Sequence, residues 1–476
     1  MPTTLVRKAE WIVAWNGSEH VYLKGADIAF RDDHILFVGR NFDGRSDIVI
    51  DGANRMIMPG LVNVHSHPSH EPVYRGIREE HGVANMYMTG LYERASAFDT
   101  SSIKLRHASL EVALCELLKS GVTSLCDISP VFEGWTDIYE KAGMRGFLAP
   151  GYSSARWKLE NDHELGFEWS SDGGQAEMDL ALAFLDRLNS DQSDLLSGVI
   201  SPMQIENCKD DLLRDSFEAA KDRAIPFTLH ISQGVLEVHE MIRRHGRTPI
   251  QHAADIGIMG PQSLFGHAIF IDRHSWINWW TEQDLGLLAD KGCSVAHCPT
   301  PFSRYGQIME SFGQYVRAGI NMAFGTDTTP HNMIEEIRKA GTLARIAAHN
   351  IHDVSTSMLF HAATVGGATA MMRDDIGRIA VGCKADIVAV DLRKPEMMPA
   401  RDPLRSLIFH AADRAVSDVW INGRKVVHEG RVKTLDHDAA AQVLTTEQIL
   451  MMERTHTKDY RHRTADEIAP ASLPVR

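Results

Sequence analysis

The sequence predicts an α/β protein built on a (β/α)8 TIM-type barrel, with a small β-sandwich domain formed from both termini. Two observations lead to this prediction. Eight short apolar runs alternate with helix-periodic segments between residues 61 and 326, a span close to the roughly 250 residues typical of such a barrel. In addition, β-rich segments lie near both ends of the chain, outside the alternating region.

The terminal segments have the features of short strands joined by turns. ADIAFRDDHILFVGR (26–40) alternates and breaks at Asp32-Asp33, as a hairpin does, and VSDVWINGRKVV (416–427) contains a tight turn at Asn422-Gly423. From about residue 437 the chain becomes polar and helix-prone. We therefore predict a β-sandwich domain from residues 1–58 and 377–436, a barrel from 59–376, and a C-terminal helical tail from 437–476.

The alternating region supplies the barrel strands. Between the runs lie amphipathic segments such as LRHASLEVALCELLKSG (105–121), which places apolar residues at helical spacing and stops at Gly121. The eight runs are LVNVHSH (61–67), VTSLCDI (122–128), RGFLAPG (145–151), SGVISPM (197–203), PFTLHIS (226–232), LFGHAIF (264–270), CSVAHCP (293–299) and INMAFGT (320–326).

Composition excludes several classes of partner. The 476 residues include 49 basic and 63 acidic side chains, a formal net charge of −14, and such a surface repels phosphate backbones and anionic lipid. No apolar run reaches the roughly 18 residues of a membrane helix. The N-terminus lacks a signal-peptide stretch, and the six cysteines form no CxxC pair. We expect a cytoplasmic homo-oligomer that acts on a small molecule and has neither nucleic-acid nor membrane partners.

Metal-ligating residue types occur where several of these runs end. Because active sites of this barrel form at the C-terminal ends of the strands, these side chains are expected to converge. In the first run, residues 65 and 67 face the same way because they are two apart in a strand. Three imidazoles and a carboxylate suit Zn²⁺, Fe²⁺, Co²⁺ or Mn²⁺. The residues are His65, His67, His230, His267, His297 and Asp327, with His297 the least secure member.

The ordered motifs PGLVNVHSH, TLHIS, FGHAIF, AHCP, FGTD and GCKADIVAVD resemble the amidohydrolase superfamily of metal-dependent hydrolases. The similarity is greatest to its branch of triazine hydrolases and ring deaminases. It implies a barrel plus a β-sandwich made from both termini. It also implies that the metal ligands are His65, His67, His230 and Asp327, and that His267 helps to position water or substrate.

Two departures from the family pattern narrow this interpretation. Binuclear members use a carboxylated lysine at the end of strand four, and here that strand reads GVISPMQ. The resemblance therefore implies one divalent metal per chain, with Zn favoured and Fe, Co or Mn as alternatives. Ring deaminases of this branch have His-x-x-Glu after strand five, whereas this chain has His230-Ile-Ser-Gln233. Glutamine cannot exchange a proton as a carboxyl does, and whether Glu237 or another group takes this role stays open.

These features predict a hydrolase that acts on C–N bonds other than peptide bonds. Asp327 is expected to act as general base towards metal-activated water, with His267 and Gln233 as the other catalytic residues. The substrate is an N-substituted amide, urea or (thio)carbamate, aryl or xenobiotic, such as a phenylurea. The strand-one loop, which includes Tyr87 and Tyr92, and the missing glutamate also resemble the phenylurea and molinate hydrolases. The alternative is an aminohydrolase or dechlorinase of a heteroaromatic ring such as a triazine, pterin or purine.

Overall fold

The computed structural model describes residues 2–77, 82–190 and 193–476, and it contains the predicted barrel. Its strands are β6 (Leu61–Ser66), β7 (Val122–Ser129), β8 (Arg145–Tyr152), β11 (Leu196–Gly198) with β12 (Ser201–Pro202), β13 (Phe227–Ile231), β14 (Ser263–His267), β15 (Ser294–His297) and β16 (Asn321–Phe324). Neighbouring strands are parallel, as β-α-β connections require. All eight apolar runs of the sequence contribute a strand.

Single β-bridges close the barrel at two points. Ile200 pairs with Phe227, which joins the fourth strand to the fifth, and Ser66 pairs with Asp327, which joins the first strand to the eighth. The fourth run is one segment in the sequence but two short strands in the structure. Both pieces pair in parallel with β8, and the pairing continues past Pro202 through the Gln204–His230 bridge.

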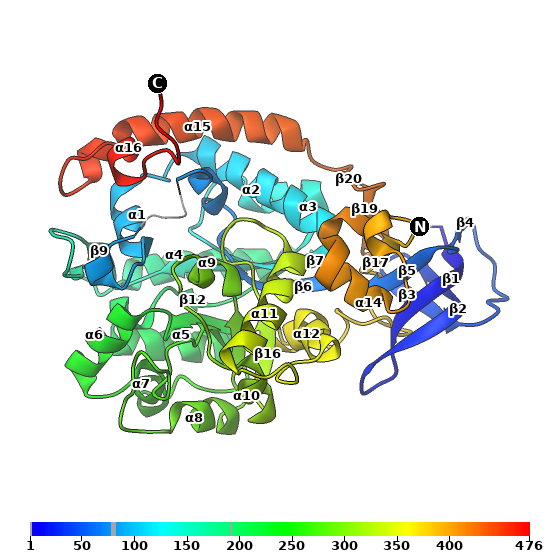
Figure 1. The fold of residues 1–476 in the computed structure, drawn as a ribbon, viewed down its shortest axis with the longest axis horizontal. Helices are drawn as coiled ribbons and strands as arrows, with labels where there is room; N and C mark the ends of the chain where they lie inside the picture. Colours follow the sequence, from blue (N-terminus) through cyan, green and yellow to red (C-terminus); the bar gives the residue numbers. More distant parts are fainter. Residues whose placement is uncertain (1, 78–81, 191–192) are drawn as a thin grey trace.

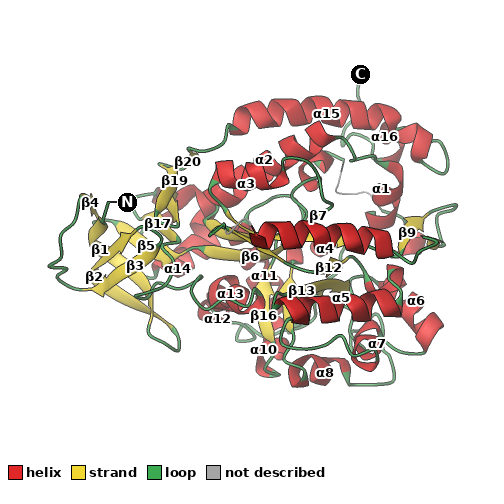
Figure 2. Cartoon of the chain, turned by 180° about the vertical axis from the view of Figure 1, so that it is seen from behind, coloured by secondary structure: helices red, strands yellow, loops and turns green. Residues whose placement is uncertain are grey.

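Helices surround the barrel (Figures 1 and 2). The loop after β6 contains a 3₁₀ helix (Glu71–Tyr74), a second (Ala84–Met86) and α1 (Leu91–Ala97) before α2 (Ile103–Lys119). The other barrel helices are α3 (Trp135–Ala142), α4 (Gln175–Ser190), α5 (Asp210–Arg223), α6 (Val235–His245), α7 (Pro249–Asp255), α8 (Asp284–Asp290), α9 (Pro299–Arg304), α10 (Phe312–Arg317), α11 (Met333–Ala347), α12 (Thr356–His361) and α13 (Gly367–Ala370). A hairpin of β9 (Ala155–Lys158) and β10 (Gly166–Trp169) follows β8.

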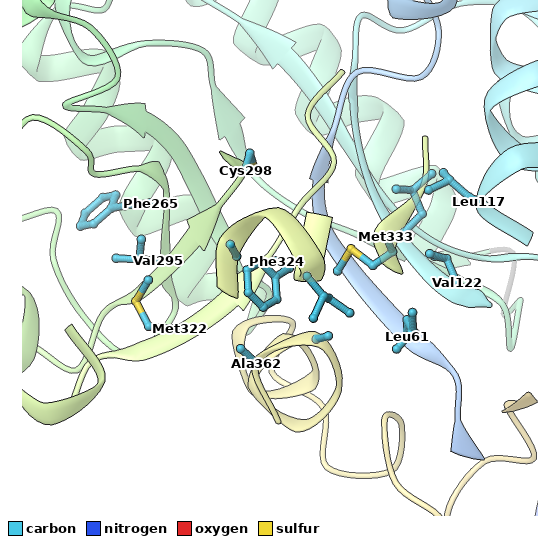
Figure 3. Close-up of a cluster of buried hydrophobic side chains, with 14 of the residues drawn as sticks. Leu61, Leu117, Val122, Phe265, Val295, Cys298, Met322, Phe324, Met333 and Ala362 are labelled. Atoms are coloured by element: carbon cyan, nitrogen blue, oxygen red, sulfur yellow. The ribbon is translucent and has the colours of Figure 1, made fainter. Parts of the chain in front are cut away.

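The main hydrophobic core lies between the strands and these helices. Figure 3 shows part of it, where Leu61 of β6, Phe324 of β16 and Met333 of α11 gather with their neighbours. All three side chains are at most 1% exposed. This packing fixes the strands, and so the strand ends that bear the polar side chains.

Strands from both termini form one nine-stranded sheet at one end of the molecule (Figure 1). They are β1 (Thr4–Trp15), β2 (His20–Arg31), β3 (His34–Gly39), β4 (Ile48–Asp51), β5 (Arg55–Pro59), β17 (Ile387–Asp391), β18 (Val416–Ile421), β19 (Arg424–His428) and β20 (Arg431–Val432). The ring centroids of Phe30 on β2 and Trp420 on β18 are 6.0 Å apart, although three strands separate β2 from β18 in the sheet order. The sheet therefore folds over its own small core.

The turns of this sheet match the sequence, whereas the first strands are longer than predicted. Asp32 (φ 52°), Asn422 (φ 47°) and Gly423 (φ 71°) adopt the left-handed conformation of tight hairpin turns. At Gly423 a Cβ would lie 1.9 Å from the Asp32 oxygen, so only glycine fits. β1 and β2 each run for 12 residues. A register shift in β1 between Val6 and Ala9 interrupts their alternation and explains why they look like shorter pieces in the sequence.

The C-terminal segment forms α15 (His437–Lys458) and α16 (Ala465–Ile468), which pack on α2 and on the loop after β6. Glu447 of α15 accepts a hydrogen bond from Ser102, and Arg463 pairs with Glu93 of α1 at 2.5 Å. The tail therefore braces the loop that covers the strand ends. No helix in the described part of the chain is long and apolar enough to cross a membrane.

Candidate metal centre

Four buried side chains from the ends of two strands, β6 and β13, and from the turn after β16 converge at the mouth of the barrel. The potential ligand atoms of His65, His67, His230 and Asp327 all lie within 4.8 Å of one another. The Nε2 atoms of His67 and His230 are 3.1 Å apart, and Asp327 Oδ1 lies 3.3 Å from His67 Nε2. This is the set that the resemblance implies, and these separations match ligands around one small cation.

Main-chain carbonyls orient two of the imidazoles. His67 Nδ1 donates to the Ile128 carbonyl at 3.0 Å, and His230 Nδ1 donates to the Met203 carbonyl at 2.6 Å. An imidazole that donates from Nδ1 presents the lone pair of Nε2, which is the form that binds a metal. At Met203, the end of strand four therefore supplies a carbonyl to this site where a binuclear member supplies a lysine.

His65 provides the test of whether a metal fits this site. Its side chain is fully buried, and within the described chain neither ring nitrogen has a hydrogen-bond partner; the nearest acid is Asp327 Oδ1, 3.5 Å away. Cβ atoms added at Gly266 and Gly325 would lie 2.7 and 2.6 Å from atoms of His65, so both glycines make room for it. A buried imidazole with no partner is costly, and a cation bound by three nitrogens and one carboxylate removes that cost.

Asp327 is placed by the closure of the barrel. Its N–H donates to the His65 carbonyl at 2.9 Å, and its own carbonyl accepts from His67 N–H at 3.0 Å. Its φ of 56° turns the chain out of β16 so that the carboxylate faces the histidines. Burial alone would raise its pKa, but contacts with His65 and His67 hold that pKa well below the usual value. Asp327 is therefore an anion next to the cation site.

His267 and His297 have different positions. His267 is fully buried at the end of β14, and its ring centroid is 4.7 Å from that of His65, within reach of a group bound beside the four ligands. Burial lowers its pKa well below the usual value, so it is neutral. His297 is not among the four converging residues; it packs near Phe312, and burial lowers its pKa to about 3.

Gln233 lies in the wall of the active-site cavity, and Glu237 lies behind that wall. The cavity is lined by both Gln233 and Asp327. The carboxylate of Glu237 instead accepts hydrogen bonds from the N–H groups of Ser232, Gln233 and Gly234 at 2.5, 2.7 and 3.4 Å. Burial and the neighbouring Glu206 raise the pKa of Glu237 well above its usual value. Glu237 thus holds the loop that presents Gln233.

The cavity beside these residues has a volume of about 40 Å³. The strand-one loop supplies Met86 together with Tyr87 and Tyr92, the two tyrosines noted in the sequence. Five further lining residues were not predicted from the sequence: Arg94, Phe302, Tyr305, Gln307 and Thr328. Phe302 and Thr328 could have been predicted as lining residues, because they follow soon after the strand ends that carry His297 and Asp327. Arg94 could not have been predicted in this way, because its position depends on how α1 folds back over the strand ends.

A second group of possible ligands lies on the outside of the barrel. Asp210, His245 and His252 come within 4.8 Å of one another. However, the two imidazole rings are stacked at 3.8 Å with an angle of 28° between their planes. Rings in this arrangement do not direct both lone pairs at one ion, so the barrel mouth remains the better cation site.

The sequence matches the Amidohydrolase family over residues 56–426, and the chain belongs to this family. It is 26% identical over 417 residues to a 5-methylthioadenosine/S-adenosylhomocysteine deaminase of Pyrococcus furiosus, covering 87% of this chain and 93% of that protein. It is 24% identical to a 5'-deoxyadenosine deaminase of Methanothermobacter thermautotrophicus, covering 89% and 96%.

Solved structures share the fold. An adenosine deaminase from Xanthomonas campestris with bound zinc has a TM-score of 0.79 at 24% identity, covering 95% of this chain and 98% of that one. A triazine hydrolase from Arthrobacter aurescens has a TM-score of 0.80 at 21% identity, covering 94% and 100%. These findings confirm the predicted fold, the branch and a metal-dependent hydrolase acting on C–N bonds. Among substrates, the relatives favour the predicted ring-deaminase alternative over the aryl urea.

Proposed function

We propose that this protein is a mononuclear hydrolase that cleaves an N-substituted amide, urea or (thio)carbamate, with aryl xenobiotics such as phenylureas as the favoured class. The observation that carries the proposal is Gln233. Among the described residues that line the cavity, Asp327 is the one carboxylic acid. Ring deamination needs an acid that protonates the ring nitrogen in addition to the base, whereas an acyclic carbonyl substrate does not.

The residues at the barrel mouth fit the chemistry of this reaction. A divalent cation held by His65, His67, His230 and Asp327 would supply Lewis acidity, which activates water and polarises a carbonyl. Asp327, kept ionised by its surroundings, takes a proton from the attacking water and returns it to the leaving nitrogen. His267, kept neutral by burial, donates a hydrogen bond to the substrate oxygen. Gln233 supplies a neutral amide that donates to the substrate or accepts from water.

The residues of the cavity wall and the cavity volume indicate which kind of substrate fits. Its apolar side consists of Met86, Tyr92 and Phe302, which suits an aromatic group. A volume of about 40 Å³ holds about three water molecules at ~10–15 Å³ each. An aryl substrate therefore requires the wall to open. At Tyr87 the wall is held by two polar contacts: Gln307 donates to the Tyr87 carbonyl at 3.1 Å, and the Tyr87 hydroxyl lies 3.4 Å from His239 Nδ1. Opening the wall at Tyr87 breaks both contacts.

The second candidate is an aminohydrolase or dechlorinase of a heteroaromatic ring, and the similarity to adenosine-type deaminases favours it. This reaction would need a proton donor in place of Gln233. Glu237 has a raised pKa, as such a donor should. Its oxygens, however, are occupied by three main-chain N–H groups.

Product analysis separates the two candidates. The protein, loaded with zinc, iron, cobalt or manganese, is incubated with aryl ureas, carbamates and anilides, and in parallel with methylthioadenosine, 5'-deoxyadenosine and chlorinated or aminated triazines. We expect release of an arylamine from the first set. Ammonia or chloride from the second set, with no arylamine from the first, would establish the ring reaction instead.

A further inference from the structure

Arg94 is a buried cation in the wall of the active-site cavity, and the proposed reaction gives it no task. It lies on α1 and is 7% exposed. Its Nη2 is 3.3 Å from Glu71 Oε1, and its guanidinium carbon is 4.7 Å from the centroid of the Tyr74 ring. Burial opposes the charge of Arg94, but Glu71 raises its pKa, so the side chain is protonated.

The Tyr305 hydroxyl also lies against this guanidinium, yet one of its nitrogens is left without a hydrogen bond. Arg94 Nη1 is buried and has no hydrogen-bond partner in the part of the chain that the structure describes. A buried charged donor without an acceptor is expensive, and buried polar groups of folded proteins are nearly always paired. Arg94 lines the same cavity as Gln233 and Asp327. A molecule bound in that cavity is therefore the natural source of the missing acceptor.

We infer that Arg94 is a specificity-determining residue that binds a neutral oxygen acceptor, such as a ketone or amide carbonyl, on the part of the substrate remote from the scissile bond. The metal ligands lie at the strand ends and Arg94 lies in the loop above them, which assigns the two contacts to different parts of the substrate. The inference rests on the proposed function, because it assumes a substrate with a remote portion.

The charges select a neutral acceptor over a carboxylate. The ion pair with Glu71 already balances the charge of Arg94. A substrate carboxylate at Nη1 would place a second anion beside the Arg94–Glu71 pair, which is itself buried. Like charges in a buried site repel one another strongly because water screens them poorly.

Three N,N-dimethyl-N′-aryl ureas that differ in one substituent test the inference. The aryl group carries acetyl, isopropyl or carboxylate, placed at the meta or the para position. Acetyl and isopropyl have nearly the same shape, but acetyl alone accepts a hydrogen bond. For one of the two ring positions we expect wild-type kcat/KM to be about tenfold or more higher for acetyl than for isopropyl, mainly through KM, and lowest for carboxylate.

Arg94→Lys is the matched variant. Lysine keeps the positive charge facing Glu71, but it has no second nitrogen that could donate to the substrate while the first pairs with Glu71. It should reduce the acetyl preference to near unity, mainly through a lower kcat/KM for the acetyl compound. Arg405→Lys, on an arginine that is 64% exposed, serves as control and should leave the preference intact. If Arg94→Lys does not fold, Arg94→Met/Glu71→Gln removes both charges together and takes its place.

The outcomes are distinct. No acetyl preference in the wild type at either position, an unchanged preference in Arg94→Lys, or a wild-type preference for carboxylate would each overturn the inference. If no urea is hydrolysed, the proposed function fails, and calorimetric binding of the same compounds still decides the role of Arg94. Equal affinities for acetyl and isopropyl would then overturn it, and a preference abolished by Arg94→Lys would support it.

Discussion

Glu237→Gln tests whether this carboxylate positions the active-site loop or takes part in the chemistry. Glu237 is 1% exposed and accepts hydrogen bonds from three consecutive main-chain N–H groups. Glutamine offers one acceptor oxygen, and its amide N–H₂ would face the remaining donors. At least one buried N–H is then left unpaired, which costs about 1–3 kcal/mol. We expect the free energy of unfolding to fall by this amount.

Chemical denaturation, steady-state kinetics and elemental analysis of the variant measure the effect. Because the loop carries Gln233 and not a metal ligand, we expect a raised KM and a lower kcat, with the metal content and the pH profile unchanged. Glu218→Gln, on a residue paired with Lys221 at the surface of α5, is the matched control and should change stability by less than about 0.5 kcal/mol. Wild-type stability and activity in Glu237→Gln would refute this reasoning. Lost activity with unchanged stability and an altered pH profile would make Glu237 the acid.

Three further predictions concern the metal, the base and a buried acid. Elemental analysis of protein prepared without chelator should find about one metal per chain, and two equivalents that are both needed for activity would contradict a single site. Asp327→Asn should abolish turnover while retaining much of the metal, since asparagine coordinates but takes no proton; activity within tenfold of wild type would move the base elsewhere. Burial raises the pKa of Glu336 from 4.5 to about 7, so its contribution to stability is present below about pH 4.5 and is lost as pH rises through 7. Glu336→Gln should therefore be more stable than wild type at pH 8, by up to about 3 kcal/mol, but not at pH 4.5; an equal difference at both pH values in urea denaturation would contradict this.

The strand ends could be predicted from the sequence because they follow simple periodicity. Apolar runs in this barrel are strands, and a polar residue at the end of such a run faces the active site, which is why His230 and Asp327 were identified. His297 shows the limit of this rule. It ends β15 in the same way, but its neighbours are Phe312 and Phe324, so it packs into the apolar core beside the site.

The cavity wall could not be predicted in the same way. Arg94 reaches the cavity because α1 folds back over the strand ends and α15 and Arg463 brace it, and these contacts are distant in sequence. The role of Glu237 depends on hydrogen bonds to main-chain groups, which leave no mark in the side-chain pattern. Sequence reasoning kept Glu237 open as an acid, and the structure places its oxygens on the loop N–H groups instead.

The most direct measurement of the central claim is the ratio of kcat/KM for an aryl urea to kcat/KM for 5'-deoxyadenosine, in the wild type and in Gln233→Glu and Gln233→Ala. We predict a high ratio in the wild type. Gln233→Glu should lower it by loss of urea hydrolysis, because a second carboxylate near Asp327 raises the pKa of one of the pair. Gln233→Ala should be milder, with the loss of one hydrogen bond of roughly 1 kcal/mol. A wild type that favours 5'-deoxyadenosine, together with a faster ring reaction in Gln233→Glu and no effect of Gln233→Ala, would contradict the account.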